Sequence, residues 1–370
     1  GKEISYMEKN DIFIIHGTDY KNMAKRILEQ AGVAADIGDT NKKVALKPNL
    51  VTAKAPSSGA TTHSELLAGV IEYLQEHGFQ NITIMEGSWV GDHTEDAFRA
   101  AGYHQVCSRY GVPFVDLQRD TWKEYDAGGI KIKLCDKAAA VDYMINMPVL
   151  KGHCQTTVTC ALKNNKGVIP NSEKRRFHTL GLHKPIAHLN TIARNDFILV
   201  DNICGDLDFE EGGNPVVMNR VLGFKDPVLC DAFVCDCMGY SVDDVPYITM
   251  ARNLGVGSTD TAHANMIYLN RATEAHSKFR MTRRVQHLAA YTAPEDACSA
   301  CYGSLIYALD RLNDMGYLRK GLPPVCIGQG YKGQEGAIGV GQCTSCFAKT
   351  LGGCPPKAAD IVEFLGNQWQ

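Results

Sequence analysis

Short apolar runs alternate with helical patterns through the first 120 residues. The apolar runs that predict strands are residues 11–16, 43–46, 81–85 and 113–117. Between them, apolar positions three and four residues apart predict helices at 20–31, 63–77 and 95–101. Continuous apolar strands that alternate with helices are typical of a sheet buried on both faces. We therefore expect an α/β fold with a mostly parallel sheet and helices on both faces.

The pattern continues to about residue 270 and then changes. Further strands are predicted at 138–147, 197–200 and 263–269, and helices at 156–162 and 226–238. Residues 271–292 are polar, basic and poorly patterned, which is typical of a linker. Beyond it the chain is rich in cysteine, with one helical pattern at 302–315. We expect an α/β domain over 1–290 and a Cys-rich, cluster-binding subdomain over 291–370.

Composition excludes several classes of partner. The net charge of −3 gives no long-range attraction to nucleic acid, and no apolar run reaches the roughly 18–20 residues that span a bilayer. Fourteen cysteines in 370 residues lie well below the density of roughly 8–10% that marks a small disulfide scaffold. We therefore expect no nucleic-acid or membrane partner, and reduced thiols in the cytoplasm.

Five cysteines in the last quarter of the chain form the strongest chemical signal. They are two Cys-x-x-Cys pairs and a cysteine followed by two prolines: Cys298, Cys301, Cys343, Cys346 and Cys354. The first pair precedes a predicted helix, whose free N–H groups can face a negatively charged centre. A final Cys-Pro ligand recurs in iron–sulfur proteins. We expect a 4Fe-4S cluster held by Cys298, Cys301, Cys343 and Cys354, with Cys346 a spare or alternative ligand.

Other interpretations of these cysteines stay open. Two Cys-x-x-Cys pairs alone would suit a tetrahedral structural zinc equally well. A weaker alternative is that the cysteines are unligated residues of the core.

Polar residues follow four predicted strands at the point where each strand ends. Their positions are Lys47 and Asn49, Glu86 and Ser88, Lys151 and His153, and Asp201. Because ligands of open α/β sheets usually bind at the carboxyl ends of the strands, we expect these side chains to converge on one edge. Each taken singly could instead be a hydrogen-bonding residue that orders a loop.

The stretch KGHCQTTVTCALKNNKG, residues 151–167, concentrates such residues. His153, Thr156 and Thr157 precede the predicted helix, and Lys163 and Asn164 close it. Free N–H groups at a helix start, with lysines nearby, predict a site for a carboxylate or phosphate. The glycine-rich signatures of a P-loop and of a dinucleotide site are both absent from the sequence.

Several motifs together resemble a known family. ALKPNLV, GATTHSEL, ITIMEGSWVGDHTEDAF, the 151–167 stretch, LVDNICG and DPVLCDAFVCDCMGY resemble, in order, the landmarks of domain of unknown function 362 over about residues 40–260. The resemblance implies an iron–sulfur protein, and many members carry a ferredoxin-like Cys-rich segment. This chain lacks the ferredoxin run, but its GGCPP is similar to the last-ligand segment of the small iron–sulfur subunits of quinone oxidoreductases. No established reaction is implied.

The function expected from these patterns is an iron–sulfur redox enzyme that acts on a small anionic substrate. The candidate catalytic residues are Lys163, His153, Glu86 and Asp201. The candidate substrate-binding residues are Lys47, Asn49, Ser88, Lys151, Thr156, Thr157 and Asn164. Two alternatives remain: an electron carrier that docks a redox protein partner through the Cys-rich tail, and a zinc-stabilised ligand-binding or hydrolytic protein.

Overall fold

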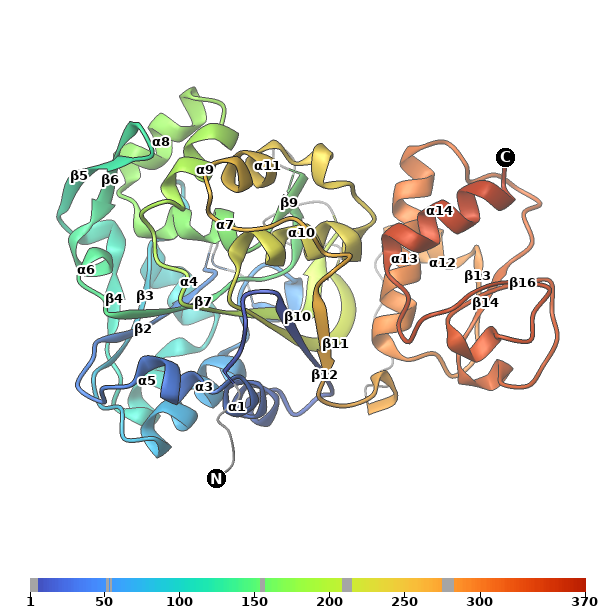
Figure 1. The fold of residues 1–370 in the computed structure, drawn as a ribbon, viewed down its shortest axis with the longest axis horizontal. Coiled ribbons are helices and arrows are strands. Elements are labelled where there is room, and N and C mark those ends of the chain that lie inside the picture. Colours follow the sequence, from blue (N-terminus) through green and yellow to red (C-terminus); the bar gives the residue numbers. More distant parts are fainter. Residues whose placement is uncertain (1–5, 51–52, 54, 154–156, 208–214, 275–282) are drawn as a thin grey trace.

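The computed structural model describes residues 6–50, 53, 55–153, 157–207, 215–274 and 283–370. Its body is built on an eight-stranded sheet of order β12-β1-β11-β10-β7-β2-β3-β4 (Figure 1). The strands are β1 (Asp11–His16), β2 (Val44–Pro48), β3 (Ile82–Glu86), β4 (Phe114–Asp116), β7 (Tyr143–Met147), β10 (Phe197–Asp206), β11 (Pro215–Phe224) and β12 (Asn265–Tyr268). β11 runs antiparallel to both of its neighbours, and the other pairings in this sheet are parallel. The predicted mostly parallel α/β sheet is confirmed.

Helices cover both faces of the sheet because its strands are apolar on both sides. On β1, Phe13 and Ile15 pack in one apolar cluster and Ile12 and Ile14 in the other. The first cluster is closed by α1 (Tyr20–Ala31), α3 (Ser64–Glu76) and α5 (Tyr103–Tyr110). The second is closed by α7 (Ala161–Asn164), α9 (His183–Leu189), α10 (Pro227–Met238) and α11 (Pro246–Asn253). Burial of these faces supplies the main stabilisation of the fold.

The body also contains several shorter helices and two hairpins. They are α2 (Val33–Ile37), α4 (Thr94–Ala100), α6 (Asp136–Ala139), α8 (Asn171–Thr179), the hairpin of β5 (Trp122–Ala127) and β6 (Ile130–Cys135), and the hairpin of β8 (Lys151–His153) and β9 (Thr157–Thr159).

The helix predicted at 156–162 is wrong. Residues Thr157–Thr159 form β9, which pairs antiparallel with β8, and α7 begins only at Ala161. The cause is local, because the β-branched Thr157, Val158 and Thr159 favour an extended backbone. Thr156 lies outside the described residues.

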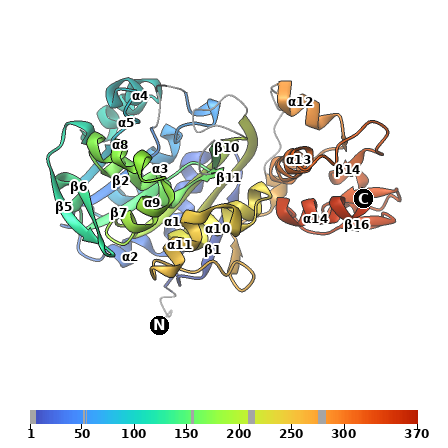
Figure 2. The same ribbon diagram turned by 90° about the horizontal axis from the view of Figure 1, so that it is seen from above.

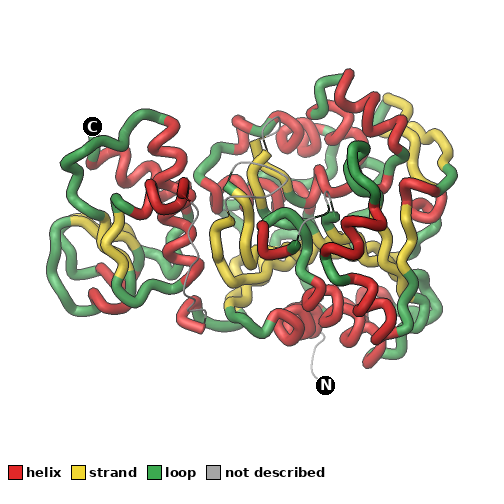
Figure 3. The backbone as a smooth tube through the Cα atoms, turned by 180° about the vertical axis from the view of Figure 1, so that it is seen from behind, coloured by secondary structure: helices red, strands yellow, loops and turns green. Residues whose placement is uncertain are grey.

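A C-terminal lobe, residues 283–370, lies beside the body and is orange to red in Figures 1 and 2. It contains α12 (Arg283–Ala289), β13 (Thr292–Pro294), α13 (Ser299–Asp314), β14 (Val325–Ile327), β15 (Ile338–Val340), β16 (Lys349–Leu351) and α14 (Ala358–Gln368). Its four strands form a parallel sheet of order β13-β14-β15-β16. Figure 3 shows the lobe from behind, with its strands and helices joined by long loops.

The lobe and the body share one apolar core. α13 packs on β11, and α14 packs on α10. Leu305 and Ile306 of α13 belong to the same buried cluster as Met218 and Leu222 of β11. None of the described helices has the length and apolar character needed to cross a membrane.

Candidate functional site

Four of the five tail cysteines line one pocket, here named the cysteine pocket: Cys298, Cys301, Cys343 and Cys354. Cys298 immediately precedes α13, and Cys301 lies in its first turn. Cys343 follows β15, and Cys354 follows β16, so both leave the carboxyl ends of the small parallel sheet. The fold thus gathers ligand-type side chains at the edge where parallel sheets usually bind ligands.

Glycine backbone lets the chain approach these sulfurs closely. Gly341 and Gly353 line the pocket, and both have positive φ angles, of 91° and 122°. A Cβ at Gly341 would lie 3.1 Å from the Sγ of Cys301. Gly341 therefore leaves space beside Cys301, whereas a Cβ at Gly353 would collide with the backbone of Pro356.

The four thiols interact electrostatically. Burial raises the pKa of Cys298 to about 11, with added repulsion from Cys354 and Cys343. Burial also raises the pKa of Cys301 and of Cys343, and the neighbouring thiolates add to both shifts. The raised pKa values favour neutral thiols, and a metal ion bound between them would favour the thiolate form instead.

Cys346 lies apart from this group. Its side chain is exposed, and it does not line the pocket. Of the five cysteines singled out from the sequence, the structure therefore brings together Cys298, Cys301, Cys343 and Cys354.

The sulfur spacing bears on which metal fits. Among the described residues, only Cys160, Cys230 and Asp231 have three ligand atoms that all lie within 4.8 Å of one another. No three of the tail sulfurs are therefore that close. In a tetrahedral zinc site with Zn–S bonds of about 2.3 Å, the sulfurs lie roughly 3.8 Å apart. The cysteine pocket is wider than such a site.

The predicted strand-end residues form a second polar region, here named the strand-end edge. Lys47 Nζ lies 2.7 Å from Glu86 Oε1, and both side chains are almost completely buried. Lys47 Nζ also donates to Asn164 Oδ1 at 3.3 Å, while Glu86 Oε2 accepts from the backbone N–H of Leu50 at 2.9 Å. The predicted Lys47, Glu86 and Asn164 therefore do meet, as a buried ion pair with its own hydrogen bonds.

The other predicted residues of this edge are also engaged. Lys151 Nζ donates to Asn49 Oδ1 at 3.3 Å and to the carbonyl of Ala60 at 2.8 Å. Ser88 Oγ donates to the carbonyl of Leu50. Each group is buried and satisfied, which stabilises the loops that leave the strands.

Asp201 pairs with a histidine that the sequence patterns did not single out. Its Oδ2 lies 2.8 Å from both the backbone nitrogen and the Nδ1 of His63. Burial alone would lower the pKa of His63, but the Asp201 carboxylate reverses this and raises it to about 11. His63 is therefore a protonated cation at neutral pH.

Of the remaining candidates in 151–167, the backbone of His153 pairs with Thr157 across the β8–β9 hairpin. Thr157 is half-buried with a φ of 73°, and Lys163 is buried in α7.

The predicted anion site at the helix start is occupied by the protein itself. Asp231 accepts hydrogen bonds from the first two N–H groups of α7, on Ala161 at 2.8 Å and on Leu162 at 3.1 Å. Burial raises the pKa of Asp231 to about 7, although these N–H groups oppose the rise. A carboxylate of α10 therefore takes the place that was expected for a ligand, and a four-residue helix offers no further N-terminal site.

Further polar residues went unnoticed in the sequence because they come from separate segments. Buried asparagine side chains join α7 to β7: Asn164 Nδ2 donates to Asn146 Oδ1 at 2.7 Å, and Asn165 Nδ2 donates to Asn190 Oδ1 at 2.8 Å. Lys174 of α8 donates to the carbonyls of Gly87 and Ser88, and burial lowers its pKa to about 8. The adjacent amides of Asn164 and Asn165 were the available signal.

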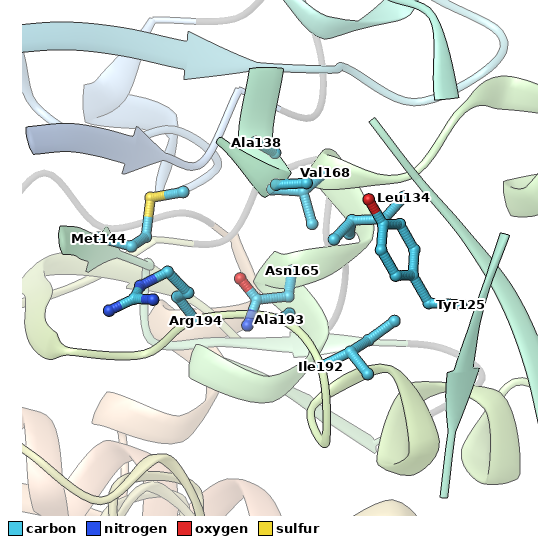
Figure 4. Close-up of a pocket in the computed structure, with 10 residues that line it drawn as sticks. Tyr125, Leu134, Ala138, Met144, Asn165, Val168, Ile192, Ala193 and Arg194 are labelled. Atoms are coloured by element: carbon cyan, nitrogen blue, oxygen red, sulfur yellow. The ribbon is translucent and has the colours of Figure 1, made fainter. Parts of the chain in front are cut away.

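A separate cavity of about 190 Å³ lies under the β5–β6 hairpin. Figure 4 shows Tyr125 and Leu134 of the hairpin on one side, Met144 and Arg194 on the other, and Asn165 between them. Its lining is mainly apolar, and it contains none of the predicted catalytic residues.

The cysteine pocket adjoins the body at the carboxyl end of β1. Ala272 and Thr273, which follow β12, form part of the pocket wall. Asn219 of β11 bridges the two parts, because its Nδ2 donates to Ser299 Oγ at 3.3 Å and its Oδ1 accepts from the hydroxyl of Tyr20 at 2.8 Å. Ser299 directly follows Cys298, so the contact reaches the first turn that carries the cysteines.

Two known proteins are similar to parts of this chain. A thylakoid-associated protein, sll1697, of Synechocystis sp. is 28% identical over 161 residues, which are 42% of this chain. The chain spans about half of that relative, 47% of its length. The lactate racemase apoprotein of Thermoanaerobacterium thermosaccharolyticum superposes with a TM-score of 0.42 at 13% identity, over 64% of this chain and 59% of that one.

The family described as Domain of unknown function (DUF362) matches residues 44–236. The matched range contains the strand-end residues Lys47, Glu86, Lys163 and Asp201, and it ends before the cysteine pocket. More than half of the chain is covered, and the chain therefore belongs to this family.

Proposed function

We propose that this protein is an iron–sulfur redox enzyme that acts on a small anionic substrate beside its cluster. The cluster is a 4Fe-4S centre held by Cys298, Cys301, Cys343 and Cys354. The observation that carries the proposal is the cysteine pocket itself: four converging sulfurs, glycine backbone against them, and a wall completed by Ala272 and Thr273 of the body.

The donor set fits this group. Four soft sulfur ligands are the usual set for such a cluster, and the pocket is wider than a tetrahedral zinc site. The cluster, when bound, supplies one-electron transfer. Because four cysteines occupy four ligand positions, the substrate is expected to bind to the protein beside the centre.

The chain's own residues then bind the substrate and move protons. The buried Lys47–Glu86 pair and the Lys151–Asn49 bond hold the strand-end edge rigid. Lys174, whose pKa is lowered to about 8 by burial, can hold or release a proton near neutral pH. His153, Lys163 and Asp201 remain proposed catalytic residues, and Asn49, Ser88, Thr156 and Thr157 remain proposed substrate-binding residues. A reducing compartment such as the cytoplasm would suit the thiols.

The test is a redox titration of protein purified without oxygen. Stepwise reduction, followed by electron paramagnetic resonance, should show a reversible one-electron signal in the wild type and in Cys346→Ser. Cys298→Ser and Cys343→Ser should lose the signal or change its shape. A protein without any such signal, or a Cys346→Ser variant that loses it like the others, would overturn the proposed centre.

A second function, electron carriage to a redox protein partner, is favoured by one observation. Cys354 is exposed, so one side of the cysteine pocket lies at the surface. The enzyme and the electron carrier differ in whether they need the residues of the α/β body. An enzyme that acts on a small substrate should lose turnover when Lys163 is changed to Gln while the redox signal stays, whereas a carrier should keep electron transfer in that variant.

A further inference from the structure

Three polar side chains lie in one row across adjacent strands at the carboxyl end of β1. In the sheet register, Arg220 of β11 pairs with His16 of β1 on one side and with Asn202 of β10 on the other. By strand alternation, all three continue the face that carries Ile14, Leu222 and Val200. They are fully buried, with His16 1%, Arg220 3% and Asn202 0% exposed.

Two members of the row have side-chain nitrogens without a hydrogen-bond partner among the described residues. Arg220 Nε donates to Asn202 Oδ1 at 2.6 Å. Because that nitrogen can only donate, the amide oxygen must face it, and Asn202 Nδ2 points elsewhere with no acceptor. Both ring nitrogens of His16 are likewise buried without a partner. Buried polar groups are almost always hydrogen-bonded, so these unpartnered atoms call for a ligand.

The charge of the row is also uncompensated. The guanidinium of Arg220 contacts Asn202 and Cys237 Sγ, the latter at 3.3 Å, and no carboxylate of the described residues pairs with it. Burial, assisted by the Arg220 charge, lowers the pKa of His16 to about 3, so the ring is neutral. The row therefore carries a single buried positive charge, and a buried charge is costly unless it is paired.

We propose that His16, Arg220 and Asn202 bind the carboxylate of a small monoanionic substrate. One negative charge balances Arg220, and the two oxygens can accept from the guanidinium, the Asn202 amide and one N–H of His16. A buried water could accept some of these hydrogen bonds but would leave the charge unpaired. A phosphate dianion would leave an excess negative charge. Two cations of the strand-end edge, Lys47 and His63, are already paired, with Glu86 and Asp201.

The position of this row links it to the cysteine pocket. The backbone of His16 is held by both ends of the Asn270 amide, two residues before Ala272 of the pocket wall. Asn219, the neighbour of Arg220, contacts Ser299 between Cys298 and Cys301. A carboxylate bound in the row therefore lies beside the centre. Its assignment as the substrate's carboxylate rests on the proposed function, whereas its binding does not.

The test is calorimetric titration of the full chain, purified without oxygen, with acetate as the probe and phosphate as the comparison. Acetate should bind, and phosphate should bind at least about tenfold more weakly. Arg220→Gln should weaken acetate binding by about tenfold or more, and Asn202→Asp should do the same because the new carboxylate takes the Arg220 charge. Arg252→Gln, an exposed arginine on α11, is the control and should bind acetate normally.

His16→Phe keeps the test decisive if the Arg220 variants fail to fold. The phenylalanine ring is similar in shape to the histidine ring but has no buried nitrogens without partners. The folded state should therefore be kept or stabilised. Acetate affinity should fall several-fold. Unchanged acetate binding in this variant, tighter binding of phosphate than of acetate, or no acetate binding by the wild type would overturn the proposal. Iron and sulfide content, measured on the same samples, separates this outcome from a failure of the proposed cluster.

Discussion

The strand-end edge and the cysteine pocket both lie at the carboxyl ends of parallel strands, yet they differ in whether their side chains are paired with other groups of the protein. At the edge, Lys47 is paired with Glu86 and His63 with Asp201, so these charges are balanced within the chain. In the cysteine pocket, burial and the neighbouring thiolates raise the pKa of Cys298 and of Cys301 beside a shared space. The paired groups of the edge stabilise its loops, whereas the four cysteines face a shared pocket where a ligand can bind.

The row of His16, Arg220 and Asn202 differs from the strand-end edge although it belongs to the same sheet. His16 and Asn202 keep buried side-chain nitrogens that have no hydrogen-bond partner among the described residues. Three strand-end residues that the sequence singled out, Lys47, Glu86 and Asp201, are instead ion-paired within the chain.

Metal removal should have the largest effect, and it should separate the two regions. A chelator applied under reducing conditions should abolish hydrogen-exchange protection in the first turn of α13 and across residues 338–354, because the four thiols of the cysteine pocket would lose their shared metal centre. Protection in β2, β3 and β7 should stay. Equal loss in both regions, or none in the lobe, would contradict the account.

Glu86→Gln should be the most destabilising single substitution at the strand-end edge. It leaves the fully buried Lys47 without a counter-charge, which should cost about 3–5 kcal/mol of unfolding free energy. Denaturant unfolding measures this, with Glu95→Gln, an exposed residue of α4, as the matched control. Iron content should not change. A loss no larger than that of the control would show that the pair is not buried as described.

Gly167→Ala should cost about 1–3 kcal/mol by crowding the same pair. A Cβ at Gly167 would overlap Glu86 Oε1 and the end of Lys47. Gly366→Ala in α14 is the control, because its nearest contact would be 3.9 Å away and alanine favours the helix. Denaturation of both variants checks the difference, and a neutral Gly167→Ala would contradict the close packing.

The His63–Asp201 pair should give a pH-dependent effect, which is smaller over any single pH unit. The pKa of His63 is raised from about 6.5 to about 11, so its stabilisation is complete below about pH 6.5 and is lost as the pH rises towards 11. Unfolding free energy should fall by up to about 1.4 kcal/mol per pH unit in this window. Asp201→Asn should flatten that slope. If Asp201→Asn left the pH dependence of the unfolding free energy unchanged, a group other than His63 would cause it.

Much of the fold was predictable because its strands follow from short runs of apolar residues. The apolar runs placed β1, β2, β3 and β10, and the Cys-x-x-Cys spacing with Cys-Pro singled out the residues that line the cysteine pocket. Short-range pattern failed at 157–159, where β-branching and pairing with β8 outweighed the helical spacing.

The rest of the site depends on long-range register. β11 was not predicted, and without it nothing in the sequence places Arg220 between His16 and Asn202. The pairing of Asp201 with His63 likewise joins residues 138 positions apart. Such contacts are set by strand order, which single-sequence periodicity does not carry.

Iron and acid-labile sulfide analysis of the full chain, purified without oxygen, tests the central claim most directly. A 4Fe-4S centre predicts about four iron and about four sulfide per chain, and these contents should persist in Cys346→Ser but collapse in Cys301→Ser. One zinc per chain without sulfide, bound by the same four cysteines, would contradict the account.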